Sequence, residues 1–482
     1  MTAIELQASL NYLPASIRHI HLMGICGTAV GALAGMLQAQ GYQVTGSDQQ
    51  VYPPMSDYLA GLGITINSGY RPENLTPRPD LVIVGNVITR HNPEAQALAE
   101  LGIPYLSMPQ ALNRFFISGK ESLVACGTHG KTTTSSLLAT LLHYLGQNPG
   151  FMIGGLVQEF GRNFRIGQGQ YFVVEGDEYD TAFFDKGPKF LHYQPKIAII
   201  TSIEFDHADI YADLEAVKAS FRKLIQIMPA DGCLIANLDD PVVAELCGEA
   251  PCQVLGYGEE QTRPWRLADL NVQAGGTSFS AYQDGTIFGH FTTRMPGRHN
   301  AMNTLAVIAV LACLGFSAAE IARQLPRFPG VRRRQEVRGE VRGVTVIDDF
   351  AHHPTAVRET LAALHAAYPG RRLVAVFEPR TNSSRRKVFQ DDYTVVFDHA
   401  DTILIKEPVA ITSLPEEMRF SARQLITDLS QRGCHATYFA DTDAVIDSLA
   451  ATSKPGDVIA IMSNGGFDNI HTRLLAALSQ SA

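Results

Sequence analysis

The sequence lacks both a long apolar run and an excess of basic charge. Its longest apolar run, residues 305–316, is shorter than the roughly 20 residues that a membrane-spanning helix needs. The formal net charge is −9, whereas nonspecific binding of nucleic acid or of anionic membrane surfaces requires basic surfaces. We therefore expect neither nucleic acid nor a membrane among the binding partners.

Cysteine is scarce and irregularly spaced. The seven cysteines include no Cys-x-x-Cys pair, so neither a disulfide framework nor a structural zinc site is indicated. Residues 1–9 contain Glu5 and lack the basic stretch that opens a secretory signal. These features predict reduced thiols and a cytoplasmic protein.

Strand-like and helix-like segments alternate along the 482 residues, which predicts an α/β fold of parallel sheets flanked by helices. At roughly 150 residues per domain the length suggests three domains, which we assign to 1–118, 119–328 and 329–482. The second joint coincides with a cluster of prolines and glycine at 326–330. Helices are expected at 32–40, 132–145 and 301–315, and an antiparallel hairpin or meander at 269–294.

A glycine-lysine loop lies between the strand expected at 122–126 and the following helix. It reads Gly127-Thr128-His129-Gly130-Lys131-Thr132. In this context backbone N–H groups and the helix N-terminus bind phosphates, Lys131 neutralises the β and γ phosphates, and the Thr132 hydroxyl holds Mg²⁺. The strict pattern has a glycine where this chain has Ala125, and the alternative is an ordinary strand-helix turn.

Two acidic stretches follow at the ends of expected strands. Glu175 ends the strand at 170–175, and a carboxylate at that edge, beside a phosphate loop, is suited to bind the nucleotide's Mg²⁺. The second stretch, 202–207, ends in His207, a candidate ligand of a second Mg²⁺ or an orienting group. The alternative for each stretch is a solvated loop.

The first block carries a weaker signal, the glycines Gly24, Gly27 and Gly31 after the strand at 17–23. They indicate either a ligand-binding loop or tight packing. Asp48, at the end of the next strand, is suited to bond a ribose hydroxyl, so a hydride-transfer cofactor is possible from this block alone.

Two further clusters lie in the third block. His352 and His353 are adjacent, and adjacent side chains point in different directions, so we do not expect both to bind one ion. The arginines at 332–334 are either a solvated charge run or contain an arginine that reaches the γ-phosphate.

Over essentially its whole length the sequence resembles the Mur ligases. The matching elements lie at 127–134, 175–180, 206–207, 297–303, 330–334 and 348–355. The resemblance implies three domains: an N-terminal Rossmann-like domain for UDP-N-acetylmuramate, a central P-loop ATPase-like domain for ATP, and a C-terminal Rossmann-like domain for the peptide. It also implies ATP-dependent amide-bond formation through an acyl phosphate.

The resemblance assigns roles to individual residues. It implies catalytic roles for Lys131, Glu175 and His207, and a Mg²⁺ site at Thr132, Glu175 and His207. The residues implied to bind ATP are Gly127, Thr128, His129, Gly130, Lys131, Thr132, Thr133, Asn300, Asn303, Arg333 and Asp349. Those implied to bind the UDP-sugar are Gly24, Cys26, Gly27, Thr28, Ser47, Asp48 and Asn86. Several relatives carry a carbamylated lysine at a position that falls near Phe221 here.

The substrate remains open between two ligations. The segments 46–56, 85–90 and 179–186 resemble the ligases that attach the whole tripeptide L-Ala-γ-D-Glu-meso-diaminopimelate in murein recycling. The first alternative is a ligase that adds free L-alanine. An NAD-linked nucleotide-sugar oxidoreductase and a regulatory ATP-binding protein are further alternatives. We expect a monomer or weak dimer.

Overall fold

The computed structural model describes residues 5–52 and 55–480. The chain divides into two compact units. The first comprises Met1–Gly127, Leu138–Ser202 and Val217–Leu255, and the second comprises Thr128–Leu137, Ile203–Ala216 and Gly256–Ala482. Most strand pairs in both units are parallel and alternate along the chain with helices, so the predicted α/β class is confirmed.

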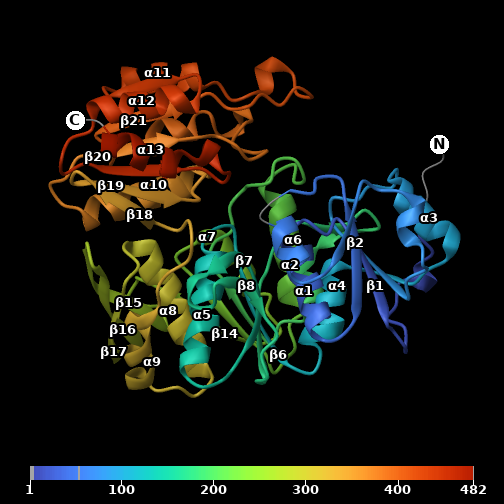
Figure 1. The fold of residues 1–482 in the computed structure, drawn as a ribbon. Coiled ribbons are helices and arrows are strands. Elements are labelled where there is room, and N and C mark those ends of the chain that lie inside the picture. Colours follow the sequence, from blue (N-terminus) through green and yellow to red (C-terminus); the bar gives the residue numbers. More distant parts are fainter. Residues whose placement is uncertain (1–4, 53–54, 481–482) are drawn as a thin grey trace. The chain divides into compact units, whose positions relative to one another are not determined.

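The first unit opens with a parallel sheet in the order β3-β2-β1-β4-β5 (Figure 1). The strands are β1 (His19–Met23), β2 (Gln43–Asp48), β3 (Thr65–Ser68), β4 (Leu81–Val84) and β5 (Tyr105–Ser107). The helices α1 (Thr28–Ala39), α2 (Met55–Gly61), α3 (Pro93–Leu101) and α4 (Met108–Leu112) alternate with them. β1 and β4 are buried along their whole length, as central strands covered on both faces are.

The helix expected at 32–40 begins earlier, at Thr28. Gly27 is its N-cap, and the Gly27 carbonyl accepts the N–H of Gly31 at 2.8 Å. A Cβ on Gly31 would lie 2.4 Å from the sulfur of Met55, so this glycine allows α1 to pack closely against α2. The glycine pattern therefore includes a tight helix contact at Gly31, and the expected helix start was four residues too late.

Six neighbouring strands of a ten-stranded sheet belong to the first unit, in the order β13-β12-β6-β9-β7-β8. Its strands are β6 (Glu121–Cys126), β7 (Gly150–Val157), β8 (Arg162–Arg165), β9 (Tyr171–Glu175), β12 (Ile197–Ile200) and β13 (Cys233–Asn237). All pairs are parallel except β7 with β8. The expected strands at 122–126 and 170–175 are confirmed, and α5 (Lys131–Tyr144) follows β6.

A short hairpin links the two sheets of this unit. It consists of β10 (Asp180–Ala182) and β11 (Asp185–Pro188). Phe183 and Phe184 at its turn pack on the core of the first sheet, where the ring centroid of Phe184 lies 4.9 Å from that of Tyr105. This contact fixes the segment that carries Thr181 and Lys189.

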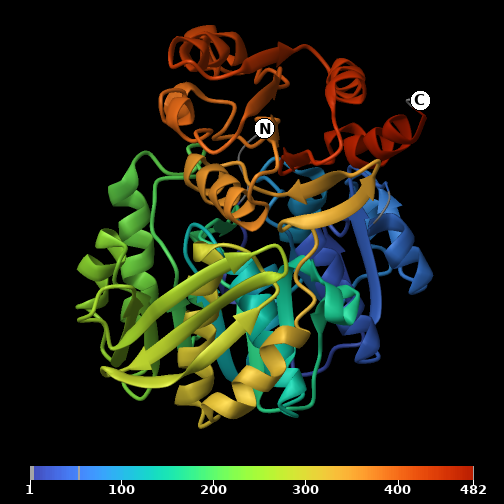
Figure 2. The same ribbon diagram turned by 90° about the vertical axis from the view of Figure 1, so that its left-hand side faces the viewer.

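In the second unit, three long strands form the predicted antiparallel meander (Figure 2). They are β15 (Trp265–Gln273), β16 (Gly276–Gln283) and β17 (Thr286–Thr293), and the end of β14 (Gln253–Gly258) pairs with β15. α8 (Arg298–Cys313) and α9 (Ala318–Gln324) follow. α8 begins before the expected 301, with Gly297 as N-cap, so His299 and Asn300 lie in its first turn rather than ahead of it.

The third sheet has the order β18-β19-β23-β20-β21-β22. Its strands are β18 (Glu336–Val341), β19 (Val344–Asp349), β20 (Leu373–Phe377), β21 (Thr402–Lys406), β22 (Ala436–Phe439) and β23 (Val458–Met462). Only β18 is antiparallel to its neighbour. The helices are α10 (Pro354–Ala367), α11 (Ala422–Gln431), α12 (Thr442–Thr452) and α13 (Ile470–Gln480).

Alternate residues of this sheet enter two separate cores, as the two-residue period of a strand requires. In β20, Ala375 and Phe377 pack with α10 and α11, whereas Val374 and Val376 pack with α12 and α13. Helices therefore cover both faces. Across the described ranges, we find no helix with the length and apolar character needed to cross a bilayer.

Candidate active site

The glycine-lysine loop connects β6 to α5, and its glycines adopt backbone conformations that other residues rarely take. Gly127 has φ 126° and Gly130 has φ 80°. A Cβ on Gly130 would lie 2.6 Å from Oδ1 of Asn303, so only glycine fits there. The Lys131 ammonium donates to the Thr128 carbonyl at 3.2 Å. A loop of this shape at a helix N-terminus can bind phosphates.

The two asparagines of α8 have different neighbours. Asn303 lies directly against Gly130, so the structure brings this predicted residue to the loop. Asn300 donates to the Pro296 carbonyl at 2.8 Å and to Oε1 of Gln335 at 3.2 Å. Both side chains are buried.

Of the arginine run, Arg334 is the residue that contacts the loop region. Its Nη2 donates to the Thr132 hydroxyl at 3.2 Å, and its guanidinium lies 4.6 Å from the centre of the Phe350 ring. The resemblance assigns ATP binding to Arg333, whose Nη2 in this structure donates to the carbonyls of Ser463 and Gly465, both at 2.6 Å. The spacing of three consecutive arginines gave no means of choosing among them.

Asp349 supports this arrangement from the end of β19. Its Oδ2 accepts the N–H of Gln335 at 2.8 Å, and its Oδ1 accepts the N–H of Ala351 at 2.8 Å. Burial raises the pKa of the carboxyl, and the nearby charge of Arg334 opposes that rise. In this structure the side chain joins the residue that follows the arginine run to the turn after β19.

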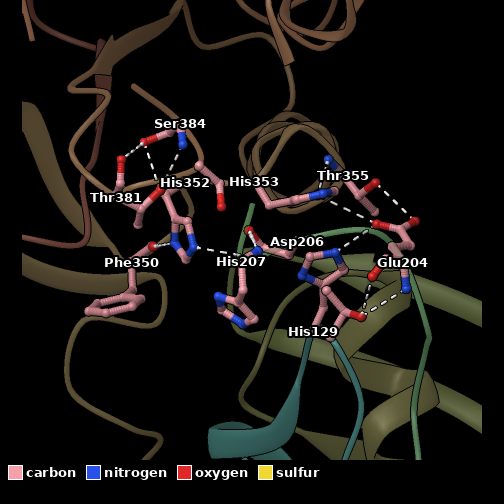
Figure 3. Close-up of polar contacts among 12 residues, drawn as sticks. His129, Glu204, Asp206, His207, Phe350, His352, His353, Thr355, Thr381 and Ser384 are labelled. Atoms are coloured by element: carbon pink, nitrogen blue, oxygen red, sulfur yellow. Dashed lines mark hydrogen bonds and ion pairs between the residues drawn. The ribbon is translucent and has the colours of Figure 1, made fainter. Parts of the chain in front are cut away.

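A cluster of polar side chains surrounds His129 of the loop (Figure 3). His129 Nε2 lies 2.8 Å from Oε2 of Glu204, and Nδ1 of His353 lies 3.5 Å from the same oxygen. The Thr355 hydroxyl donates to the other Glu204 oxygen at 3.1 Å. Sequence reasoning singled out the stretch 202–207 but not Glu204, because nothing in the spacing links it to His353.

His352 and His353 face different partners, as expected for adjacent residues. Nε2 of His352 lies 3.9 Å from Oδ2 of Asp206, whereas Nε2 of His353 contacts the Phe205 carbonyl at 3.2 Å (Figure 3). Burial lowers the pKa of His352 to about 4. Burial would raise the pKa of Asp206, but the charges of the surrounding histidines, His207 first, hold it well below its usual range. His207 itself has φ 54°, and its N–H donates to Asp206.

Glu175 ends β9 in the first unit. Its Oε2 accepts the N–H of Gly154 at 2.8 Å, and a Cβ on Gly154 would lie 3.0 Å from that oxygen. The glycine thus leaves room for the carboxylate. Thr133, in the first turn of α5, is buried.

The position at which several relatives carry a carbamylated lysine is apolar in this chain. Phe221 on α6 (Leu214–Gln226) is fully buried, and its ring lies 5.4 Å from that of Phe190. Lys218, on the same helix, pairs with Glu245 at 2.7 Å. The described structure therefore has no lysine at that position.

A cavity of about 330 Å³ opens beside the Gly24 loop in the first unit. Six of the seven residues predicted for the UDP-sugar line it: Gly24, Cys26, Gly27, Thr28, Asp48 and Asn86. The seventh, Ser47, lies behind the lining, where its hydroxyl donates to Glu94 at 2.7 Å. Sequence reasoning missed Thr181 and Lys189, which reach the cavity from the hairpin segment and are distant in sequence.

The loop at this cavity is held by Asp48. Its two carboxylate oxygens accept the N–H groups of Cys26 at 2.9 Å and Gln50 at 3.0 Å. Burial and the Asp48 charge raise the pKa of the Cys26 thiol to about 11, so it stays protonated at neutral pH. Lys189 pairs with Asp177 at 2.9 Å and provides a cation at the cavity wall.

Comparison with characterised proteins decides the family. The UDP-N-acetylmuramate–L-alanyl-gamma-D-glutamyl-meso-2,6-diaminoheptandioate ligase of Escherichia coli K12 is 40% identical over 464 residues, which cover 96% of this chain and 99% of the relative. The chain belongs to the Mur ligase family. The enzyme of the same name from Haemophilus influenzae Rd is 37% identical, over 96% and 99% of the two chains. A UDP-N-acetylmuramate–L-alanine ligase of Geotalea uraniireducens is 35% identical, over 96% and 98%.

Three Mur ligase models match successive segments. They are the Mur ligase family catalytic domain at 19–118, the Mur ligase middle domain at 126–311 and the Mur ligase glutamate ligase domain at 333–465. A murein peptide ligase of Psychrobacter arcticus 273-4 superposes with a TM-score of 0.70 at 34% identity, over 96% of this chain and 99% of that one. The relatives named here are all ligases, which argues against the oxidoreductase and non-catalytic alternatives.

Proposed function

We propose that this Mur ligase is an ATP-dependent enzyme that joins UDP-N-acetylmuramate to the tripeptide L-Ala-γ-D-Glu-meso-diaminopimelate. The supporting observation is the sequence identity to relatives of each kind. Two relatives whose names specify this tripeptide are 40% and 37% identical to the chain, and six relatives named as L-alanine ligases are 32–35% identical. The domains would be 1–118 for the UDP-sugar, 119–328 for ATP and 329–482 for the peptide. ATP and reduced thiols are in keeping with the cytoplasm.

A carboxylate and an amine do not condense at neutral pH without activation. In the proposed route, the γ-phosphoryl group of ATP passes to the lactyl carboxylate and ADP leaves. The α-amine of the tripeptide's L-Ala then attacks the acyl carbon, and phosphate departs as the amine loses a proton. Carboxylate and triphosphate repel each other, so Lys131 and Arg334 must offset their charge. Because water hydrolyses an acyl phosphate, the protein must also exclude solvent.

The resemblance to the Mur ligases assigns three side chains to a magnesium ion. We assign this role to the Thr132 hydroxyl, the Glu175 carboxylate and His207. The Thr132 hydroxyl and the Glu175 carboxylate offer the oxygen ligands that Mg²⁺ prefers. Bound Mg²⁺ would offset negative charge on the transferring phosphoryl group. Thr132 would present its hydroxyl, with Arg334 fixing the orientation of that group.

Arg334 is the arginine that we expect to matter most for turnover. Arg334→Ala should lower kcat by about 10- to 100-fold, because a hydrogen bond from a charged donor contributes about 1.5–3 kcal/mol and about 1.4 kcal/mol is a factor of ten in rate. Arg332→Ala is the matched control, since Arg332 belongs to the same run and its side chain is exposed. The measurement is ADP release at saturating ATP. Equal losses in the two variants would show that only the net charge of the run matters.

The choice between tripeptide and L-alanine can be measured directly. Purified protein is supplied with Mg-ATP and UDP-N-acetylmuramate, and with either the tripeptide or L-alanine over a range of concentrations. We expect kcat/KM to be at least about 10-fold higher with the tripeptide. A site that binds the polar groups of the tripeptide has protein groups that stay unpaired when L-alanine is bound instead. A higher value with L-alanine would reassign the enzyme to the alanine-adding ligases.

A further inference from the structure

Three side chains from separate segments of the second unit converge next to the glycine-lysine loop (Figure 3). They are His129 from the loop, Glu204 from the segment after β12, and His353 from the residue that precedes α10. One ligand atom from each lies within 4.8 Å of those of the other two. The roles proposed for ligation leave Glu204 and His353 without a function.

The distances from the Glu204 oxygen to the two histidine nitrogens bracket the spacing of neighbouring ligand atoms around a tetrahedral metal ion. Zinc bonds to nitrogen and oxygen are about 2.0–2.2 Å long, which separates neighbouring ligand atoms by about 3.3 Å. Here the Glu204 oxygen lies 2.8 Å from His129 Nε2 and 3.5 Å from His353 Nδ1. Two imidazoles and one carboxylate favour zinc over magnesium, which prefers oxygen ligands. Small side-chain shifts would therefore suffice to admit zinc.

The surrounding hydrogen bonds orient two of the ligands as metal sites do. Nε2 of His353 contacts the Phe205 carbonyl at 3.2 Å, so the proton sits on Nε2 and the lone pair of Nδ1 faces the cluster. In this structure that lone pair accepts the N–H of Thr355 at 3.2 Å, and a bound ion would replace this N–H as its partner. The Thr355 hydroxyl holds Glu204 through its other oxygen, leaving Oε2 directed at the two histidines.

We propose that His129, Glu204 and His353 form a binding site for a zinc ion, with water completing the tetrahedron. The site is separate from the side chains assigned to magnesium. A bound zinc ion would tie the glycine-lysine loop to the start of α10, so the loop would be restrained by an ion other than the one that serves ATP.

The test measures metal binding without any substrate, so it does not depend on the proposed ligation. Zinc affinity is measured by competition with a chromogenic chelator in excess Mg²⁺, and cobalt is added separately to record its visible spectrum. His353→Asn removes the imidazole but keeps a side chain that caps α10 well. His352→Asn is the matched control, because the neighbouring histidine faces Asp206 instead. Glu204→Gln provides a second ligand variant.

We expect wild-type protein and His352→Asn to bind one zinc ion with equal affinity and to give the intense visible bands of tetrahedral cobalt. His353→Asn and Glu204→Gln should each bind at least about 10-fold more weakly. Undiminished binding in both ligand variants would overturn the proposal, as would an equal loss in His352→Asn. Cobalt spectra dominated by thiolate charge-transfer bands would also overturn it, because they would assign the metal to cysteines.

Discussion

Replacing Lys131 with alanine should lower the rate of ligation by about 10²–10³-fold, because loss of one preorganised electrostatic contact to a developing charge has an effect of that size. Lys131 is the first residue of α5 and follows the glycines whose shape directs the loop's N–H groups. The substitution removes the ammonium and leaves the backbone of the loop in place, since alanine is a good helix former. The rate is followed by the appearance of ADP and of the UDP-linked product.

Lys223→Ala is the matched control for this loss of charge. Lys223 lies on α6 with an exposed side chain, so its removal should leave kcat unchanged. Thermal unfolding of both variants excludes a general loss of structure. If Lys131→Ala retained more than about a tenth of the wild-type rate, the lysine could not be the principal countercharge to the triphosphate.

The loop itself could be predicted because its chemistry is local. A strand, two glycines, a lysine and a helix follow one another within a short segment, and the structure has each of them in that order. The partners of the loop are not local. Asn303 packs on Gly130, and Arg334 donates a hydrogen bond to Thr132. Both pairs are far apart in the sequence, and one sequence alone does not predict such contacts.

The same reason explains which of the other residues were missed. Glu204 belongs to a stretch that was recognised as acidic, yet its significance depends on His353 at the start of α10. Lys189 reaches the cavity because the aromatic turn of its hairpin docks on another core. Sequence patterns indicate the chemistry of a single helix, strand or loop. Tertiary packing determines which of these elements contact each other.

Ser47 is a residue that was predicted to bind the UDP-sugar but whose side chain does not line the cavity. Its position at the end of β2 resembles that of a ligand-binding residue, but the structure turns its hydroxyl inward to Glu94. Its backbone carbonyl, by contrast, accepts the N–H groups of Gly24 at 2.8 Å and Ile25 at 3.1 Å. Ser47 therefore positions the Gly24 loop through its backbone carbonyl. Its side chain is held by Glu94, which makes Glu94 important for the fold.

That residue, Glu94, is the centre of a buried network in the first unit. Its carboxylate is fully buried and bonds His21 at 2.8 Å, Ser47 at 2.7 Å and Asn74 at 2.7 Å. These partners come from β1, β2 and the segment after β3, so one side chain joins two strands to a connecting segment. Removing it leaves several buried donors without an acceptor, and each costs about 1–3 kcal/mol.

Glu94→Ala should therefore lower the free energy of unfolding of the first unit by about 3–5 kcal/mol, the range observed when one partner of a buried charged network is removed. Urea unfolding measures this loss. Glu100→Ala is the matched control, because Glu100 lies on the same helix, α3, with an exposed side chain and should change stability by less than about 0.5 kcal/mol. Equal stability of the two variants would mean that water replaces the carboxylate at no cost, and the network would then have no structural role. A selective loss in Glu94→Ala would instead show that the stability of the first unit depends on this buried carboxylate.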